Sequence, residues 1–265
     1  MFMQRLIMTL ILIPLVLIGI YALPSTYFSG IVLFLVGLMI WEWQQFVTMP
    51  EIKNPYLKFL ILFIGTLLVF KFWPYFLYID ILFWLFAVFA VLSFPKHQEL
   101  WGNSGFIAMT AWILLGVFAA IVINLQSDAY GKHELVAILM IVWAADIGAY
   151  LVGKRWGQHK MIPNVSPGKS WEGLFGGIGV ALLVGGLETI LMHPLSVLQW
   201  LGIVFITALI SVIGDLWMSL LKRKCQLKDT GHLIPGHGGI LDRLDSLLAA
   251  APVFYLCSHI FLNRC

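Results

Sequence analysis

The sequence is poor in charged residues. Only 11% of its 265 residues are Asp, Glu, Lys or Arg, whereas 61% are hydrophobic and the mean hydropathy is +0.94. A soluble domain of this length needs far more charge to cover its surface, so the composition excludes that class. The net charge of +3 is also small, which argues against nucleic acid as a partner.

Cysteine is scarce as well. The three cysteines are Cys225, Cys257 and Cys265, and no CxxC pair or zinc-type Cys/His spacing occurs. A disulfide framework and a structural zinc site are therefore excluded. The short alternating polar and apolar segments typical of transmembrane strands are missing too.

Long hydrophobic runs fill most of the chain. A run of about twenty residues can cross the hydrocarbon core, and only a helix satisfies its own backbone there. We predict an all-α, polytopic integral membrane protein with about nine transmembrane helices. They are expected near 6–23, 27–46, 57–73, 75–94, 106–125, 134–153, 173–192, 198–221 and 247–262. The first run is longer than a signal-peptide core and is followed at once by another, so we expect it to be retained.

The positions of Lys and Arg predict the orientation. With a cytoplasmic N-terminus, the inner loops receive every Lys and Arg except Lys71, Lys132 and Arg264. This bias is the positive-inside pattern, and it favours an N-terminus inside and a C-terminus outside. The two long loops, 154–172 and 222–246, are polar and basic and would both face the cytoplasm. We divide the single membrane domain into N-terminal helices, 1–130, and C-terminal helices with catalytic loops, 131–265.

Acids within the predicted spans are costly and therefore informative. Glu42, Asp80 and Glu188 fall near helix ends, where we expect them to reach water. Asp146 and Asp215 lie deeper, roughly 10 Å below the inner surface at about 1.5 Å rise per residue. Two carboxylates at one depth, each leading into a basic loop, predict a polar cavity that opens to the cytoplasm, although structural hydrogen-bonded acids are the alternative.

The C-terminal loop interleaves acids, cations and glycines. In a helix, Asp215, Ser219 and Lys222 share one face, and Arg223, Lys228 and Asp229 follow. Gly238 and Gly239 then precede a helix on which Asp242, Asp245 and Ser246 share a face, with Arg243 between them. Glycines and a helix N-terminus together favour a phosphate.

The interleaving indicates a specific chemistry. Acids alone would suggest a cation site, and cations alone a membrane-surface patch, which is the default interpretation for Lys224. Together they fit Mg²⁺ bound to a polyphosphate, because carboxylates bind the metal and Lys and Arg bind phosphate oxygens.

Gly168-Lys169-Ser170 superficially suggests a P-loop. That motif needs another glycine five residues before Gly168, where Pro163 stands, and a preceding strand in a βαβ unit. We reject a P-loop and expect Lys169 and Ser170 to fold toward the cavity and contribute to a nucleotide site.

A family resemblance becomes specific at this point. Ser219-x2-Lys222-Arg223-x4-Lys228-Asp229, followed by Pro235-x-His237-Gly238-Gly239-x2-Asp242-Arg243-x-Asp245, closely resembles the signature of phosphatidate cytidylyltransferases (CDP-diacylglycerol synthases). The resemblance extends upstream to Asp146-Ile-Gly-Ala-Tyr150, Gly153-Lys-Arg155-Trp-Gly157 and Ser166-Pro-Gly-Lys169-Ser170-Trp-Glu172-Gly173. Gly168 is a minor departure, since a second Lys is common there. The N-terminal half resembles the family only in hydropathy and length.

The resemblance implies the reaction CTP + phosphatidate → CDP-diacylglycerol + pyrophosphate, with Mg²⁺ and room for a second metal ion. It implies metal ligands Asp215 and Asp242, with Asp245 completing the shell or orienting a cation. The implied cations around the phosphates are Lys222, Arg223, Lys228 and Arg243, with Asp229 orienting Lys228. His237 would assist proton transfer or brace the glycine turn. The implied nucleotide-binding residues are Ser166, Lys169, Ser170, Ser219, Gly238 and Gly239.

Two other functions remain open from the sequence. A CTP-dependent polyprenol or lipid kinase would transfer the γ-phosphate instead of CMP, and an ion-coupled transporter would use Asp146 and Asp215. A CDP-alcohol phosphotransferase is disfavoured because its D-G-x2-A-R-x8-G-x3-D-x3-D pattern is missing. We expect CTP and phosphatidate as partners, a multi-pass protein of the bacterial inner membrane with a cytoplasmic active site, and, from the family, a homodimer.

Overall fold

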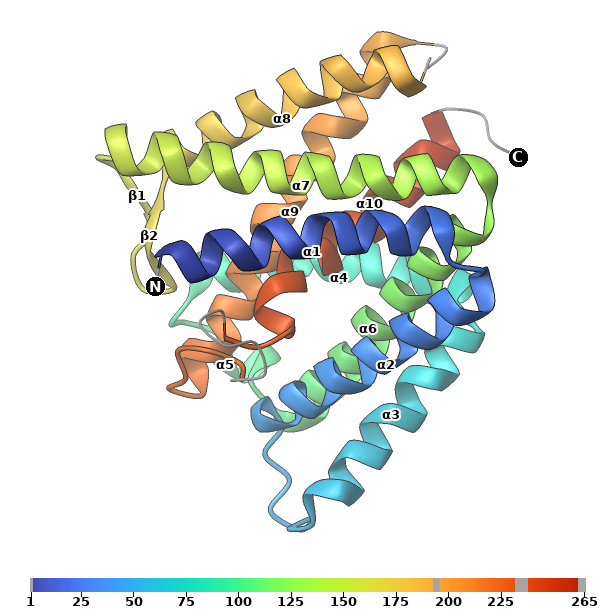
Figure 1. Cartoon of the computed structure of the whole chain (residues 1–265). Coiled ribbons are helices and arrows are strands. Elements are labelled where there is room, and N and C mark those ends of the chain that lie inside the picture. Colours follow the sequence, from blue (N-terminus) through green and yellow to red (C-terminus); the bar gives the residue numbers. More distant parts are fainter. Residues whose placement is uncertain (1, 193–195, 232–237, 262–265) are drawn as a thin grey trace.

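The computed structural model describes residues 2–192, 196–231 and 238–261 and is almost entirely helical (Figure 1). Its helices are α1 (Phe2–Ala22), α2 (Ser25–Trp43), α3 (Pro55–Lys71), α4 (Trp73–Ser93), α5 (Gln98–Trp101), α6 (Ser104–Ser127), α7 (Ala129–Trp156), α8 (Trp171–Met192), α9 (Val197–Lys224) and α10 (Leu241–Phe261). A 3₁₀ turn, η1 (Gln44–Phe46), follows α2, and a hairpin of β1 (Lys160–Ile162) and β2 (Ser166–Ser170) joins α7 to α8.

The predicted all-α membrane class is confirmed. Each predicted long helix has a counterpart, and seven described helices are long and apolar enough to span a bilayer: α2 with η1, α4 and α6 to α10. The described apolar part of α1, Leu12–Ala22, is shorter, and α3 has 17 residues. Nine spans and a cytoplasmic N-terminus therefore stay predictions.

Three local features differ from the expected layout. Asp128 accepts a hydrogen bond from the Gly131 amide at 2.7 Å, and this cap starts α7 five residues before its apolar run. Helix α10 starts at Leu241 rather than at 247, so its first turn is polar. The loop 154–172 is not wholly irregular, because β1 and β2 pair antiparallel within it.

Helix α6 is the centre of the bundle. In its most apolar stretch 78% of the residues are buried, and the helix packs against α2, α3, α4, α7 and α10. Large apolar side chains point outward elsewhere, for example Leu82, Leu85 and Leu92 on α4. Buried small residues inside and exposed aliphatic ones outside are expected when the surrounding solvent is lipid.

Helices α7 and α8 form the most extensive helix pair and run side by side along one edge of the molecule (Figure 1). Glycines allow this approach. A Cβ at Gly177 would lie only 2.5 Å from the Ala145 carbonyl oxygen. Gly179, on the same helix, has no atom within 4 Å of its Cβ position.

Replacement of glycine by alanine should change the stability of the protein differently at Gly177 and at Gly179. Gly177→Ala should destabilise the protein by about 1–3 kcal/mol, because the added methyl group overpacks the helix interface. Gly179→Ala should leave stability unchanged or raise it slightly, since alanine favours a helix more than glycine. Thermal unfolding in detergent compares them, and equal melting temperatures would contradict the close packing of α7 on α8.

Candidate active site

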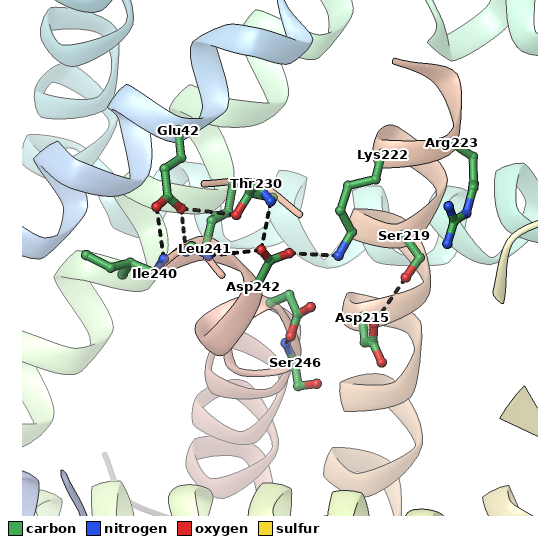
Figure 2. A network of polar contacts seen from close by, with 12 residues as sticks. Glu42, Asp215, Ser219, Lys222, Arg223, Thr230, Ile240, Leu241, Asp242 and Ser246 are labelled. Carbon is green, nitrogen blue, oxygen red and sulfur yellow. Dashed lines mark hydrogen bonds and ion pairs between the residues drawn. The ribbon is translucent and has the colours of Figure 1, made fainter. Parts of the chain in front are cut away.

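The acid and base row predicted on α9 is present. Ser219 Oγ donates to Asp215 Oδ1 at 3.2 Å, as expected for residues one helical turn apart. Lys222 follows on the same face, and its Nζ lies 2.7 Å from Asp242 Oδ1 on α10. The Lys222 and Asp242 side chains are only 12% and 7% exposed, so this ion pair is a shielded link between the two helices (Figure 2).

The hairpin after α7 reaches the same row. Lys169 on β2 places its Nζ 2.7 Å from Asp215 Oδ2 and also donates to the Val212 carbonyl at 3.3 Å. Arg223 Nε donates to the Val165 carbonyl at 3.1 Å, which ties the hairpin to the end of α9. Lys169 thus folds toward Asp215, as expected, and the hairpin is bonded to the end of α9 where the second long loop starts. The role of Lys169 in a nucleotide site stays a prediction.

The two serines of the hairpin differ from Lys169. Ser170 is buried, and its Oγ accepts a hydrogen bond from the Gly173 amide at 3.1 Å, so it caps α8. Ser166 begins β2 and is half-buried. Their roles toward a nucleotide stay predictions.

Asp242 holds the chain that leads into α10. Its Oδ2 accepts hydrogen bonds from the Thr230 amide at 2.7 Å and from the Gly239 amide at 3.1 Å. Its Oδ1 bonds Lys222, so both oxygens have partners. Asp242 therefore organises the glycine turn as well as contributing charge.

Asp245 and Asp146 complete a cluster of carboxylates around Asp215. Helices α9 and α10 touch closely here, since a Cβ at Gly214 would lie 2.5 Å from the Asp245 carbonyl oxygen. Asp245 is buried, accepts the Ser246 amide at 2.7 Å, and interacts electrostatically with Asp215, Lys222 and Asp146. Asp146 also interacts electrostatically with Lys169 and Arg243. Asp146 and Asp215 therefore lie close enough for their charges to interact, and the polar cavity expected between them stays a prediction.

The donor set suits Mg²⁺ in type. Among the described residues no three His, Cys, Asp or Glu side chains form a ready metal cage, so Asp215, Asp242 and Asp245 do not converge as one. Mg²⁺ does not need such a cage, because it is usually bound by one or two carboxylates together with water and substrate phosphates. The charges of Asp215 and Asp245 repel each other, which a cation between them would relieve. The Asp215 oxygens also have partners, Lys169 and Ser219, but Asp215 is 33% exposed whereas Asp242 is 7% exposed, so Asp215 is the more accessible of the two to an ion.

Glu42 is the site residue that the sequence reasoning missed. We expected Glu42, Asp80 and Glu188 to reach water, and this was wrong: their residual exposures are 4%, 0% and 4%. Glu42 Oε1 accepts from the Ile240 amide at 3.0 Å, and its Oε2 accepts from the Leu241 amide at 2.8 Å and from Thr230 Oγ1 at 3.1 Å (Figure 2).

The sequence contains an indication that a distant acid is needed at the start of α10. Helix α10 begins at Leu241 and is preceded by Ile240, and an isoleucine side chain cannot accept hydrogen bonds from the unpaired amides of a helix N-terminus. A buried helix start without a local cap requires a distant acceptor. An acid between Trp41 and Trp43, at the end of an otherwise apolar helix, was a candidate.

The glycines of the turn have steric reasons. Gly238 has φ +85°, a backbone conformation that side chains disfavour. A Cβ at Gly239 would collide with Thr230 Oγ1 and the Glu42 carboxylate. Because the amides of Gly239, Ile240 and Leu241 are already bonded to Asp242 and Glu42, they do not form an open phosphate cradle here.

The remaining predicted residues lie around this core. Lys228, Asp229 and Arg243 are exposed, as suits groups that meet a soluble substrate. His237 lies outside the described residues, and its role stays a prediction. Burial raises the pKa of the Cys225 thiol at the end of α9, so this cysteine is no ready nucleophile.

Known proteins match the chain over nearly its whole length. The family model described as the cytidylyltransferase family matches residues 3–261. The phosphatidate cytidylyltransferase of Haemophilus influenzae is 33% identical over 280 residues, covering 95% of this chain and 96% of that protein. The Pseudomonas aeruginosa enzyme of the same name is 35% identical over 267 residues, covering 95% and 94%. The Bacillus subtilis one is 36% identical over 182 residues, or 67% of each chain.

These matches include the N-terminal half, where the motifs alone carried no resemblance. The site built from α9, α10 and the hairpin, and the length of the matched region, lead to one assignment: this chain belongs to the cytidylyltransferase family.

Proposed function

We propose that this chain transfers CMP from CTP to phosphatidate and releases pyrophosphate, giving CDP-diacylglycerol for phospholipid synthesis. The observation that carries the proposal is the pair of ion pairs, Lys169 with Asp215 and Lys222 with Asp242, in one cluster at one end of a membrane bundle. The family and the names of its relatives give the reaction. An ion-coupled transporter needs no such interleaving of cations and acids.

The residues suit the demands of the reaction. A phosphate oxygen of phosphatidate attacks the α-phosphorus of CTP, and the bond between the α- and β-phosphates breaks. The attacking group is already an anion, so it needs little general-base help. The difficulty is to bring two polyanions together, and fixed cations lower that barrier by stabilising charge on the reacting phosphates.

Each cation has a distinct place in the proposal. Lys222 is held in a shielded position by Asp242, and Lys169 is held in a partly exposed one by Asp215, so both ammonium groups are oriented before substrate arrives. Exposed Lys228 and Arg243 would meet the triphosphate and the departing pyrophosphate. Arg223 is anchored at Nε by Val165, which leaves the rest of its guanidinium to bind phosphate.

Mg²⁺ is part of the proposal. Asp215 and Asp245 would hold it, and Asp146 lies near enough to add charge. The ion, with a second one where the site takes two, would neutralise the triphosphate and polarise the α-phosphorus. Asp242 would act beside them through Lys222 and the glycine turn.

The membrane setting follows the same reasoning. We propose nine spans, a cytoplasmic N-terminus and a site facing the cytoplasm of a bacterial inner membrane, because the cationic loops lie at the site end. That side supplies CTP, and the phosphate of a lipid lies at the same interface. A homodimer is proposed from the family alone, and the mass of the detergent-solubilised protein tests it.

Product analysis tests the reaction. The purified protein in detergent should pass the α-³²P of CTP to phosphatidate when Mg²⁺ is present, release pyrophosphate, and stop when EDTA is added. Label passed from the γ-position would instead identify a CTP-dependent lipid kinase. A folded protein that passes neither label to lipid would contradict both, and transport would then be the function to test.

A further inference from the structure

The start of α10 depends on a side chain from the other half of the protein. The first amides of a helix have no partner within it, and burial makes them costly to leave unpaired. At α10 the Ile240 and Leu241 amides are bonded to Glu42, which is 198 and 199 residues away in the chain. Asp242 bonds the preceding amide, that of Gly239.

Glu42 also fits its place closely. A Cβ at Gly231 would lie 2.6 Å from Glu42 Oε1, and one at Gly239 would collide with Oε2. Within the described chain its side-chain partners are two amides and the Thr230 hydroxyl, not a cation. The positive end of the α10 dipole stabilises a carboxylate at this position.

The contacts continue from Glu42 into the site. Thr230 bonds Glu42 through its hydroxyl and Asp242 through its amide. Asp242 in turn holds Lys222 at 2.7 Å. Gln45 lies in η1, one turn beyond Glu42, and donates a hydrogen bond to the Thr230 carbonyl, so it also anchors Thr230. Figure 2 shows the series of contacts from Glu42 through Thr230 and Asp242 to Lys222.

We infer that Glu42 is a positioning residue for CMP transfer. Its carboxylate occupies the helix N-terminus where a phosphate would otherwise bind, and so directs the triphosphate toward the side-chain cations. It fixes the glycine turn and the first turn of α10, and through Thr230 and Asp242 it sets the position of Lys222. The inference rests on the proposed function, since positioning has meaning only for a reaction at this site.

Glu42→Gln tests the inference with almost no change in volume. A glutamine keeps one acceptor oxygen and turns an NH₂ group toward donors, so at least one bond is lost. We expect kcat/KM for CTP to fall on the order of 10- to 100-fold, as for other groups that orient a site from behind. The KM for CTP should rise, while the KM for phosphatidate stays within about twofold.

Glu188→Gln is the matched control. Glu188 is equally buried, its carboxylate oxygens have no hydrogen-bond partner in the described part of the chain, and it lies near the far end of α8. Its removal should leave both KM values unchanged. If Glu42→Gln only reduces the amount of active protein, with both KM values those of wild type, Glu42 is structural and the inference fails.

Amide hydrogen exchange of residues 238–246 separates this inference from the proposed function. Exchange there should be faster in Glu42→Gln than in wild type or Glu188→Gln, whether or not the protein transfers CMP. Unchanged exchange would overturn the inference even if the reaction is as proposed.

If Glu42→Gln does not fold, Thr230→Val is the second test, because it removes one of the three hydrogen bonds that the Glu42 carboxylate accepts. It should shift exchange and the KM for CTP in the same direction, and wild-type values in this variant would overturn the inference.

Discussion

Asp215→Asn should abolish CMP transfer, with kcat/KM lower by on the order of 10³-fold or more. Removal of a single preorganised charge-stabilising contact commonly lowers the rate about 10²- to 10³-fold. Asp215 contributes to more than one such contact. It pairs with Lys169 at 2.7 Å, accepts from Ser219, and is one of the two carboxylates proposed to hold Mg²⁺. Asparagine keeps the shape of the side chain but loses its charge.

The control for Asp215 is a buried acid outside the site. Asp80 on α4 is 0% exposed and accepts a hydrogen bond from Trp84 Nε1 at 3.0 Å, outside the site. Asp80→Asn should leave the specific activity of the folded protein near that of wild type. The assay is transfer of labelled CMP to phosphatidate at several Mg²⁺ concentrations. Activity in Asp215→Asn within tenfold of wild type would remove Asp215 from the proposed metal site.

Lys222→Met should have the second-largest effect, lowering kcat/KM for CTP on the order of 10²-fold or more. Methionine keeps the apolar stem but removes the ammonium group that would bind phosphate. It also leaves Asp242 buried without its cation, which is a costly state for a 7% exposed carboxylate. The loss should therefore appear in activity and, more weakly, in thermal stability.

Lys224→Met separates this effect from a general loss of positive charge. Lys224 lies two residues further on α9 and donates to the Gly102 carbonyl, away from Asp242. It should retain most of the activity. The double variant Lys222→Met/Asp242→Asn should be less impaired than two independent losses predict, because the pair acts as a unit. Full additivity, or equal losses for Lys222→Met and Lys224→Met, would contradict the proposed role.

The predictable part of the site was local in the chain. Asp215, Ser219 and Lys222 could be placed on one face because the helical period relates residues four and seven apart. The same reasoning grouped Asp242, Asp245 and Ser246. The Gly168-Lys169-Ser170 string could be assigned to the site only from motifs, and its ion pair with Asp215 depends on how the hairpin folds back across α9.

The unpredictable part depended on contacts between distant segments. Glu42, Asp80 and Glu188 were expected to reach water because their depth in a helix was known but their neighbours were not. The same gap made the glycine turn look like an open phosphate cradle, whereas its amides are bonded to carboxylates.

By itself, the sequence determined that this is a bundle of apolar helices with one polar, basic end, because lipid leaves the backbone no partner except its own helix. It also determined the acid and cation motifs and the family. Only the tertiary structure decided which acids share the site, that β2 delivers Lys169, and that α2 caps α10 through Glu42. The physical reason is that hydropathy and helical period act over a few residues, whereas burial and hydrogen-bond partners are set by how the helices pack.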